Sequence, residues 1–559
     1  MRLPSAKNLL LTTVLLVVLS VCLSTVSLYV TPESGSQTRV LVNETFQLSP
    51  NETYRQGLGS FYGDENVTVK VQSSPPLQEN FSLQLPLSND ILLIKSGIAY
   101  NTTKPNFSYS FLASPDYYDA VFTSNSSKTR TINFEALDQK PKVAYPYAWL
   151  NEPSKIMFFV TLAAAILLAL KIAMSGFSTC KPSKLALPSL SRTAQRRLLT
   201  LLLFGLVVWL LVLALNSNPL GTFENWYTDN ARDSYVASLF VKDGFSVFSQ
   251  PIGKLSSLDV SNFKYVTWPQ MPNLYPLGSV LLFAPFGVLI QNGVNSTLIF
   301  KIEIAIFLTV ATACAYFFLR VYLNKDMTLI LKLLGVYIIY VTLVACAADG
   351  TFESVAFIFS LFAIYMFVTE RYDYFLLLIT VSTFFKYEAA LFLLPLIGVG
   401  LIRLIQKNKV NTLIRNKAVL AALGFSSVSA FTAYLSAPYL ASGAPQLIMN
   451  GINAFSSNTH ISWANQSFFV LLTLAATLAY AVYMLNKNPL LSLSALFLLL
   501  PSFAMPYIQN WYMPFLFVYA LIPQQKKELN ATVFWLIFMV AVLAFSGTNF
   551  QLLIPYFHQ

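Results

Sequence analysis

Residues 198–215 read LLTLLLFGLVVWLLVLAL, a run without a single charged side chain. An apolar run of this length crosses the hydrocarbon core of a bilayer as an α-helix. Residues 198–559 are therefore predicted to form a bundle of transmembrane helices. We expect the further spans at about 277–291, 298–320, 331–348, 352–369, 374–385 with 389–402, 418–437, 467–485, 490–505, 511–523 and 531–547.

The composition of the whole chain agrees with this interpretation. Of the 559 residues, 55% are hydrophobic and only 11% are charged, and the mean hydropathy is +0.58. A soluble protein carries about a quarter of its residues as charges. The chain is expected to be a polytopic α-helical membrane protein with about 11–14 transmembrane segments.

The net charge of +11 does not indicate a nucleic-acid partner, because the charge lies where membrane loops carry it. Two stretches without acids hold the excess. Their basic residues are Lys171, Lys181, Lys184, Arg192, Arg196 and Arg197, and then Arg403, Lys407, Lys409, Arg415 and Lys417. Loops of this kind stay in the cytoplasm, so both stretches are expected there.

Cysteine and histidine usage argues against several kinds of site. The cysteines Cys22, Cys180, Cys314 and Cys346 are scattered, which suggests neither a disulfide framework nor a thiolate metal site. With His460 and His558 as the only histidines, a histidine metal centre or a Ser-His-Asp triad is not expected. We expect no resident cofactor and no metal.

The N-terminal region differs from the bundle. Residues 8–30 follow Arg2 and Lys7 and are longer than the apolar part of a typical signal peptide, so residues 1–30 are predicted to be an uncleaved anchor with a cytoplasmic N-terminus. Residues 31–153 are polar and alternate strictly, as in VTVKV at 67–71 and FSYSF at 107–111. This pattern predicts an all-β domain, sandwich-like in form.

Glycosylation sequons place that domain outside the cytoplasm. Seven of the nine asparagines between residues 31 and 150 stand in N-x-S/T, far above the chance of about one in four. They are Asn43, Asn51, Asn66, Asn80, Asn101, Asn106 and Asn125. Residues 154–197 are then expected to hold a return helix at 155–174 and the basic cytoplasmic linker.

Topology counted from the cytoplasmic basic stretch 403–417 leaves one conflict. Segment 277–291 follows the long outside loop 216–273 and would begin and end on the same face. It is either re-entrant or has a misplaced boundary. Irregular backbone at membrane depth is tolerated only beside protein or a water-filled cavity, so the conflict hints at a cavity here.

The loop 216–273 holds the most informative polar residues. Asp229, Arg232, Asp233 and Tyr235 stand at helical spacings, and a helix lying on the membrane surface would show them on one face. Such a face offers a carboxylate that can accept a proton and a cation that can stabilise an anion. The alternative is an ordinary solvated charge cluster.

Other polar residues are expected on the same side of the membrane. Lys386 and Glu388 interrupt a long apolar stretch; Lys386 either meets an anionic substrate or pairs permanently with Glu388. For Glu353 a helix-capping role is an equal alternative. The remaining candidates are Trp268 and Tyr275, which could instead be interfacial aromatics, His460 in a later loop, and Asn510 and Tyr512 at a late span.

In their order along the chain, these features resemble the GT-C glycosyltransferases, and among them the polyprenol-phosphate-mannose-dependent mannosyltransferases. The residues that carry the resemblance are the Asp, Arg and Tyr of the first large loop, then Gly244, Tyr275-Pro276-Leu277, Phe384-Phe385-Lys386 followed by Leu393-Leu394-Pro395, and Asn510-Trp511-Tyr512. The resemblance covers about 198–547. Departures are the missing second proline after Tyr275, and the absence of both an outward Asp-x-Asp pair and the Trp-Trp-Asp motif of oligosaccharyltransferases.

The resemblance implies an inverting transfer of mannose or another hexose from a polyprenyl-phosphate donor to a glycan, lipid or protein acceptor on the extracytoplasmic face. Asp229, with Asp233 close behind, would be the general base, and Arg232 and Lys386 would contact the phosphate. The other substrate-binding candidates would be Tyr235, Trp268, Tyr275, Glu353, His460, Asn510 and Tyr512. The expected location is the cell membrane, or the endoplasmic reticulum membrane of a eukaryote.

Two other functions fit parts of the sequence. A transporter or flippase of lipid-linked sugars would carry broken helices in both halves, and only one such interruption is apparent. A surface-layer anchoring protein would rely on the β domain and tolerate changes at Asp229, Arg232 and Lys386.

Overall fold

The computed structural model describes most of the bundle and of the β region. The described ranges are 31–50, 53–61, 66–74, 80–84, 98–103, 106–112, 116–124, 127–144, 146–150, 192–216, 229–255, 272–348, 350–407, 410–413, 415–441, 463–504 and 512–543, with a few isolated helical positions between 12 and 160. Most of the expected anchor and return helix, and the basic linker up to residue 191, lie outside them.

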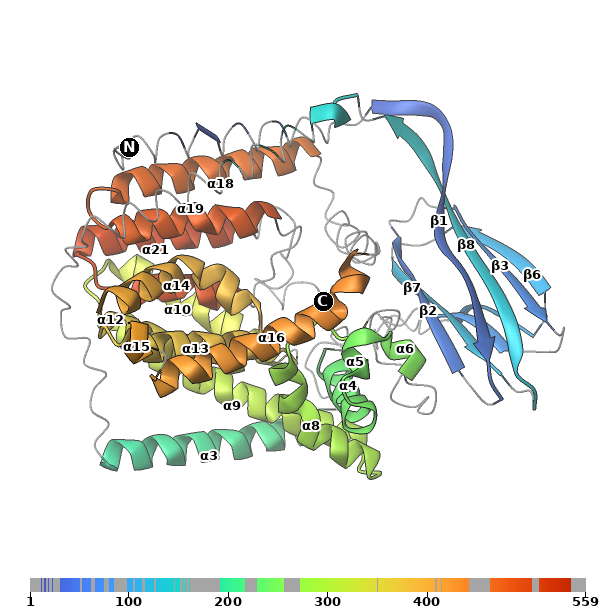
Figure 1. Cartoon of the computed structure of the whole chain (residues 1–559), viewed down its shortest axis with the longest axis horizontal. Coiled ribbons are helices and arrows are strands. Elements are labelled where there is room, and N and C mark those ends of the chain that lie inside the picture. The colour runs from blue at the N-terminus through green and yellow to red at the C-terminus, as the bar shows by residue number, and fades with distance from the viewer. Residues whose placement is uncertain are drawn as a thin grey trace.

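Helices make up the larger part of the described chain, and their bounds lie close to the expected apolar segments (Figure 1). They are α3 (Arg192–Leu215), α4 (Asp229–Asp243), α5 (Ser246–Ser249), α6 (Ile252–Leu255), α8 (Leu277–Gln291), α9 (Ser296–Leu323), α10 (Leu329–Tyr340), the π-helical turn η2 (Val341–Ala345), α11 (Cys346–Ala348), α12 (Glu353–Val368), α13 (Tyr372–Phe385), α14 (Glu388–Lys407), α15 (Val410–Leu413), α16 (Lys417–Ala441), α18 (Trp463–Met484), α19 (Pro489–Ala504), α20 (Met513–Phe517), the 3-10 helix η4 (Val518–Leu521) and α21 (Lys526–Leu543).

Several of these helices are suited to a bilayer. Among the described residues, four stretches are long and apolar enough to cross one: Ser296–Leu323, Leu329–Ala348, Glu388–Lys407 and Lys417–Pro438. Shorter apolar helices accompany them, α8, α12 and α13 included. The outer helix α3 leaves Leu203, Phe204 and Leu211 more than half exposed, as expected of side chains that face lipid. The chain is therefore a helical membrane protein.

The expected span 511–523 differs from its neighbours. Its described helical part is α20 continued by η4, Met513–Leu521, which falls well short of the about 20 residues that a span needs. Every side chain from Met513 to Leu521 is buried, so this segment is an internal element of the bundle.

The expected interruption at Lys386 is present. Helix α13 ends at Phe385 and α14 begins at Glu388, so Lys386 lies in a break between two helices.

Eight strands form two antiparallel sheets. Sheet order is β1-β8-β3-β6 and β2-β7-β4-β5. The strands are β1 (Thr31–Leu48), β2 (Thr53–Phe61), β3 (Asn66–Ser74), β4 (Asn80–Gln84), β5 (Ile98–Thr102), β6 (Asn106–Leu112), β7 (Asp116–Thr123) and β8 (Arg130–Ala144), followed by a short 3-10 turn, η1 (Ala148–Leu150). In β3, Val67, Val69 and Val71 are buried while the residues between them are not, which is the expected alternation.

The two sheets share one apolar core. Leu58 and Phe122 come from the β2-β7 sheet and Val69 and Phe134 from the β1-β8-β3 sheet, and all four belong to the same buried cluster. The sheets therefore face each other as a sandwich. Three sequon asparagines with described side chains, Asn43, Asn66 and Asn106, are exposed on this sandwich.

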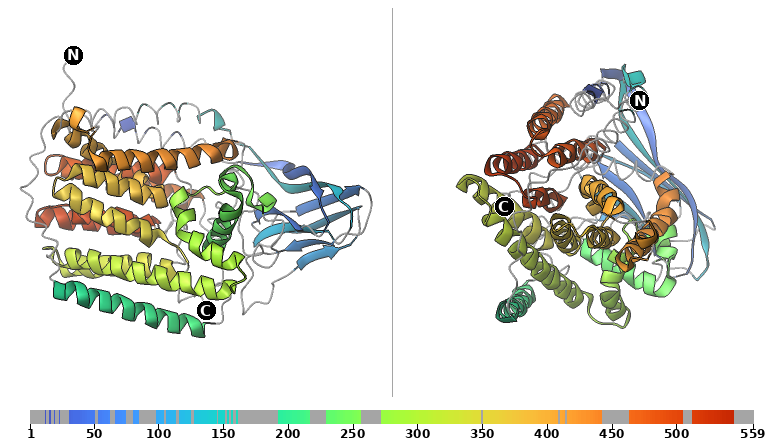
Figure 2. Two further views of the ribbon diagram at one scale, coloured as in Figure 1. Left: turned by 60° about the horizontal axis from the view of Figure 1, so that its bottom comes forward. Right: turned by 60° about the vertical axis from the view of Figure 1, so that its left-hand side comes forward.

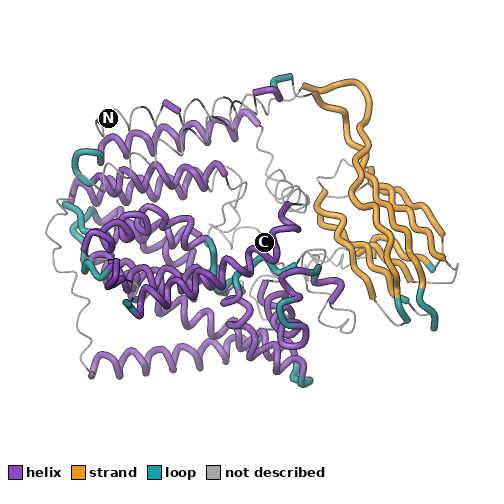
Figure 3. Tube along the Cα trace, in the orientation of Figure 1, coloured by secondary structure: helices purple, strands orange, loops and turns teal. Residues whose placement is uncertain are grey.

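The sandwich lies at one end of the helical bundle (Figures 2 and 3). Contact there is made between β2 and the short helix α6. At this same end lie α4 and α8. A Cβ on Gly278 in the first turn of α8 would collide with the Phe384 carbonyl oxygen, and Ile290 in its last turn packs with Ile299 of α9. Both ends of α8 are thus at the same end of the bundle.

Candidate functional site

Helix α4 provides the first part of the site. It begins at Asp229 and ends at Asp243, and the next residue, Gly244, forms a left-handed C-cap with a backbone φ of +60° and an N–H bond to the Phe240 carbonyl. Every side chain from Asn230 to Leu239 is buried. Helix α4 therefore has no solvated face from Asn230 to Leu239, and α8, α9 and α5 pack against it.

Close backbone approach fixes α4 against α8. A Cβ on Gly287 of α8 would lie 2.6 Å from the Ser238 nitrogen, so only glycine fits at this crossing. Gln291 at the end of α8 also donates a hydrogen bond to the Ser238 carbonyl. The polar residues of α4 are therefore held at set positions.

Arg232 and Asp233 form a buried ion pair on α4. Arg232 Nε donates to Asp233 Oδ1 at 2.9 Å, and Arg232 Nη2 lies 2.9 Å from the same oxygen. The two residues are 4% and 6% exposed. The alternative of an ordinary solvated charge cluster is therefore wrong for this pair. Burying two charges costs desolvation free energy, which the attraction between them offsets only when their geometry is good.

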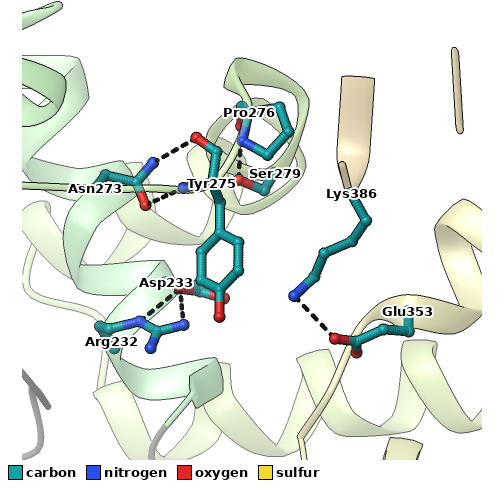
Figure 4. Close-up of polar contacts among 8 residues, drawn as sticks. All are labelled: Arg232, Asp233, Asn273, Tyr275, Pro276, Ser279, Glu353 and Lys386. Atoms are coloured by element: carbon teal, nitrogen blue, oxygen red, sulfur yellow. Dashed lines mark hydrogen bonds and ion pairs between the residues drawn. The ribbon is translucent and has the colours of Figure 1, made fainter. Parts of the chain in front are cut away.

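Tyr275 lies between the two cations of the site (Figure 4). The Arg232 guanidinium carbon is 4.9 Å from the centre of the Tyr275 ring, and Lys386 Nζ is 3.9 Å from it. Both distances suit cation–π contact. Because they meet at one ring, α4, the start of α8 and the α13–α14 break converge on a single place.

Asn273 holds the backbone of Tyr275. Its Nδ2 donates to the Tyr275 carbonyl and its Oδ1 accepts from the Tyr275 N–H, both at 3.3 Å. Pro276 then caps α8, where its carbonyl accepts a hydrogen bond from Ser279 Oγ at 2.7 Å. The ring is thus presented by a short braced turn before the helix.

Lys386 is paired with Glu353. Lys386 Nζ lies 2.8 Å from Glu353 Oε1, and the two residues are 2% and 5% exposed. The Phe352 ring packs beside the ammonium at 4.7 Å. The sequence left two roles open for Lys386: contact with an anionic substrate or a permanent ion pair with Glu388. The pair with Glu388 does not occur, because Lys386 pairs with Glu353. Glu388 Oε2 is buried and has no hydrogen-bond partner in the described part of the chain.

The structure describes the side chains of some of the other candidate residues and not of others. Tyr512 caps α20 and packs on Phe392 at 6.0 Å between ring centroids. Tyr235 is 3% exposed and belongs to the apolar core of the bundle. Asp229 begins α4, but its side chain lies outside the described residues, as do Trp268, His460 and Asn510.

Two polar residues near the site, Asn273 and Glu303, are not among the candidates predicted from the sequence. Asn273 gives no pattern that marks it as a brace. Glu303 on α9 is fully buried and accepts a hydrogen bond from Ser234 Oγ of α4. A signal for Glu303 was present, because a lone acid inside an apolar span is a functional candidate by default.

Comparisons with known proteins give little guidance. No protein-family model matches the sequence, and no curated protein matches it. Among solved structures, the chain is similar to arabinosyltransferase EmbB from Mycobacterium smegmatis, determined by cryo-EM, at 10% sequence identity and a TM-score of 0.32. The match covers 96% of this chain and 53% of that one, so this chain spans about half the length of that protein. A likeness this loose assigns neither family nor activity.

Proposed function

We propose that the chain is a membrane glycosyltransferase of the GT-C type, which moves a sugar from a polyprenyl-phosphate donor to an acceptor hydroxyl on the extracytoplasmic face. The observation that carries the proposal is the convergence of Asp233, Arg232 and Lys386 on the ring of Tyr275. It supports the proposal because a carboxylate that could accept a proton and two cations that could bind a phosphate lie close together, beside apolar helices that could hold a lipid tail.

Asp233 is proposed as the general base. The acceptor hydroxyl gives its proton to the Asp233 carboxylate while its oxygen bonds to the anomeric carbon, and the bond from that carbon to the phosphate oxygen breaks. Attack opposite the leaving group inverts the anomeric configuration. The sequence ranks Asp229 ahead of Asp233, but Asp233 is proposed here because its described side chain pairs with Arg232.

Charge balance supports pairing the base with Arg232. As Asp233 becomes neutral, the departing lipid phosphate gains a negative charge. The guanidinium thus loses the charge of its carboxylate partner at the moment when a new anion forms nearby. Its planar donors suit a phosphate as well as a carboxylate. During the step, the anion paired with Arg232 changes from the Asp233 carboxylate to the lipid phosphate. The charge of Arg232 is therefore balanced throughout.

Lys386 is proposed as the second phosphate contact. Its ammonium lies on the Tyr275 ring opposite Arg232, with Glu353 as its partner when no donor is bound. The donor phosphate would compete with that carboxylate. This competition makes Lys386 a substrate-binding residue whose charge remains balanced with and without donor.

The extracytoplasmic side is inferred from the sandwich. Its exposed sequon asparagines Asn43, Asn66 and Asn106 lie on strands of the sandwich, which stands at the end of the bundle that holds α4. Nucleotide sugars are cytoplasmic, so an enzyme working on this side needs a lipid-borne donor. Mannose or another hexose is our proposal for the sugar, and donor and acceptor suffice for the reaction without a resident cofactor.

A transfer assay tests the proposal. Membranes that contain the protein are supplied with labelled polyprenyl-phosphate mannose and, in parallel, labelled polyprenyl-phosphate glucose, and incorporation into lipid and protein is measured. Asp233→Asn is expected to lower kcat by about 100-fold or more, as loss of a general base does. Asp243→Asn, the same change at the other end of α4, is the matched control and should transfer at the native rate.

The outcomes distinguish the assignments. If Asp233→Asn transfers normally and Asp229→Asn does not, the base is Asp229. If all three variants match the native rate, neither acid is the base. Membranes of the native protein that transfer neither sugar would count against the proposed function itself.

A further inference from the structure

Glu303 lies inside the bundle where a carboxyl group is least expected. It stands on α9, is 0% exposed, and has the buried apolar residues Phe300, Ile304 and Phe307 as neighbours on the same helix. Moving an ionised carboxylate into such surroundings is costly unless a cation pairs with it. The proposed reaction has no step for Glu303, so its presence needs a separate explanation.

The contacts of Glu303 point toward α4. Ser234, the residue after Asp233, donates its hydroxyl hydrogen bond to Glu303 Oε1. Glu303 Oε2 is buried with no hydrogen-bond partner, and no ion pair is made to Glu303 within the described ranges. An isolated, unpaired carboxylate oxygen in this setting is best explained by a proton on the group.

The charged groups around Glu303 agree with a neutral carboxyl. On α4, Asp233 is near enough for its charge to act on Glu303, and Arg232 is committed to Asp233. On α9, Lys301 donates to the Asn216 carbonyl at the end of α3. A second negative charge here would repel the Asp233 carboxylate and compete for Arg232.

We propose that Glu303 is a positioning residue for Asp233, acting as a neutral carboxyl that anchors Ser234 and thereby sets the rotation of α4. The inference rests on the proposed function, which gives Asp233 its role. Two anchors a turn apart hold α4: Ser234 is tied to α9 through Glu303, and Ser238 is tied to α8 through Gln291. The first anchor stands directly beside the base.

Four variants separate a neutral anchor from a charge. Glu303→Gln has nearly the same shape, is always neutral and keeps a hydrogen bond to Ser234. Glu303→Leu and Ser234→Ala each remove the bond. Thr309→Val is the matched control, since Thr309 stands on α9 but bonds only within that helix, to the Ala305 carbonyl.

The expected results differ sharply between the variants. Glu303→Gln should keep kcat within about two-fold of native, with the same pH dependence of kcat/KM. Glu303→Leu and Ser234→Ala should each lower kcat about ten-fold with little change in the donor KM, since a small misplacement of a reacting group has effects of this size. The double variant should be no worse than either single one, because both remove the same bond. Thr309→Val should behave as native.

Hydrogen exchange gives a readout that does not depend on activity. In detergent or nanodiscs, amides of the peptide 229–243 should exchange faster in Glu303→Leu and Ser234→Ala, and at the native rate in Glu303→Gln and Thr309→Val. Equal exchange in all four proteins would overturn the anchor, whatever the enzyme assay finds.

The kinetic results can also overturn it. If Glu303→Gln loses as much activity as Glu303→Leu, or shifts the acid limb of kcat/KM by about one pH unit, Glu303 acts as an anion and the proposal is wrong. Failure of the proposed function would look different: the native protein would not transfer, yet the exchange pattern of α4 would still follow the anchor.

Discussion

Lys386 and Glu353 form a buried ion pair, with Nζ and Oε1 2.8 Å apart, although Glu353 begins α12 and Lys386 lies in the break between α13 and α14. Neither residue is more than 5% exposed. Tyr275 covers the ammonium from the side of Arg232. A buried pair is strongly destabilised when one partner is removed and far less when both are replaced. Single and double substitutions of Lys386 and Glu353 therefore test whether the pair is formed.

Glu353→Gln should leave Lys386 without its carboxylate. We expect the free energy of unfolding to fall by roughly 3 kcal/mol, while the KM for the lipid-phosphate donor decreases because the phosphate no longer competes with Glu353. Thermal unfolding in detergent measures the loss of stability, and initial rates over a range of donor concentrations measure the KM. Glu353→Gln combined with Lys386→Met should recover much of the lost stability and lose donor binding. A donor KM that rises in Glu353→Gln would count against the competition.

Asp233→Asn should separate binding from chemistry. Because the amide cannot balance the guanidinium charge, Arg232 should hold the donor phosphate more tightly, so the donor KM should fall while kcat drops about 100-fold or more. Arg232→Gln should do the opposite to binding, raising the donor KM as well as lowering kcat. Initial rates over a range of donor concentrations measure this. Equal increases of KM in both variants would speak against the shared role of Arg232.

Gly287→Ala should disturb the packing of α4 on α8. The added methyl would come within 2.6 Å of the Ser238 backbone nitrogen, so the helices must separate. Overpacking of this kind costs about 1–3 kcal/mol, and the melting temperature should fall. Gly398→Ala on α14 is the control, since nothing lies within 4 Å of its Cβ. If the two variants melt alike, the close crossing does not fix α4.

Lys325→Met should stabilise the fold at neutral pH. Lys325 lies in the turn between α9 and α10, where burial lowers its pKa from 10.5 to about 8 and its Nζ contacts the Leu521 carbonyl at 3.2 Å. Below pH 8 both states bind the proton, and the folded state bears the full penalty of a buried charge. The penalty shrinks as pH rises from 8 toward 10.5.

The measurement for Lys325→Met is the difference in melting temperature from the native protein at pH 7 and at pH 9.5. It should be positive at pH 7 and smaller at pH 9.5. Lys526→Met, in an ion pair more than half exposed on both sides, should show little difference at either pH. A Lys325→Met effect that does not change with pH would mean that charge burial is not its cause.

Local patterns in the sequence predicted much of the fold. The uncharged run at 277–291 became α8 with the same bounds, and alternation at 67–71 became the half-buried strand β3. The polar break at Lys386 also appears where the apolar stretch is interrupted. These features depend on residues close together in the chain, so hydropathy and period suffice.

Features set by distant residues could not be predicted in this way. Glu353 rather than the adjacent Glu388 pairs with Lys386, because helix packing decides which carboxyl meets the ammonium. The burial of Arg232 and Asp233 arises from α8 and α9 covering α4, which the helical spacing within α4 does not reveal. The same holds for Glu303, whose partner Ser234 is 69 residues away.

The central claim is that Arg232 and Lys386 hold the donor phosphate around Tyr275, next to Asp233. A structure of the protein with bound polyprenyl phosphate, determined by cryo-EM, tests it most directly. We predict the phosphate within about 3 Å of both Lys386 Nζ and the Arg232 guanidinium, with its lipid tail against apolar helices. A phosphate bound elsewhere, with the Lys386–Glu353 and Arg232–Asp233 pairs unchanged, would contradict the claim.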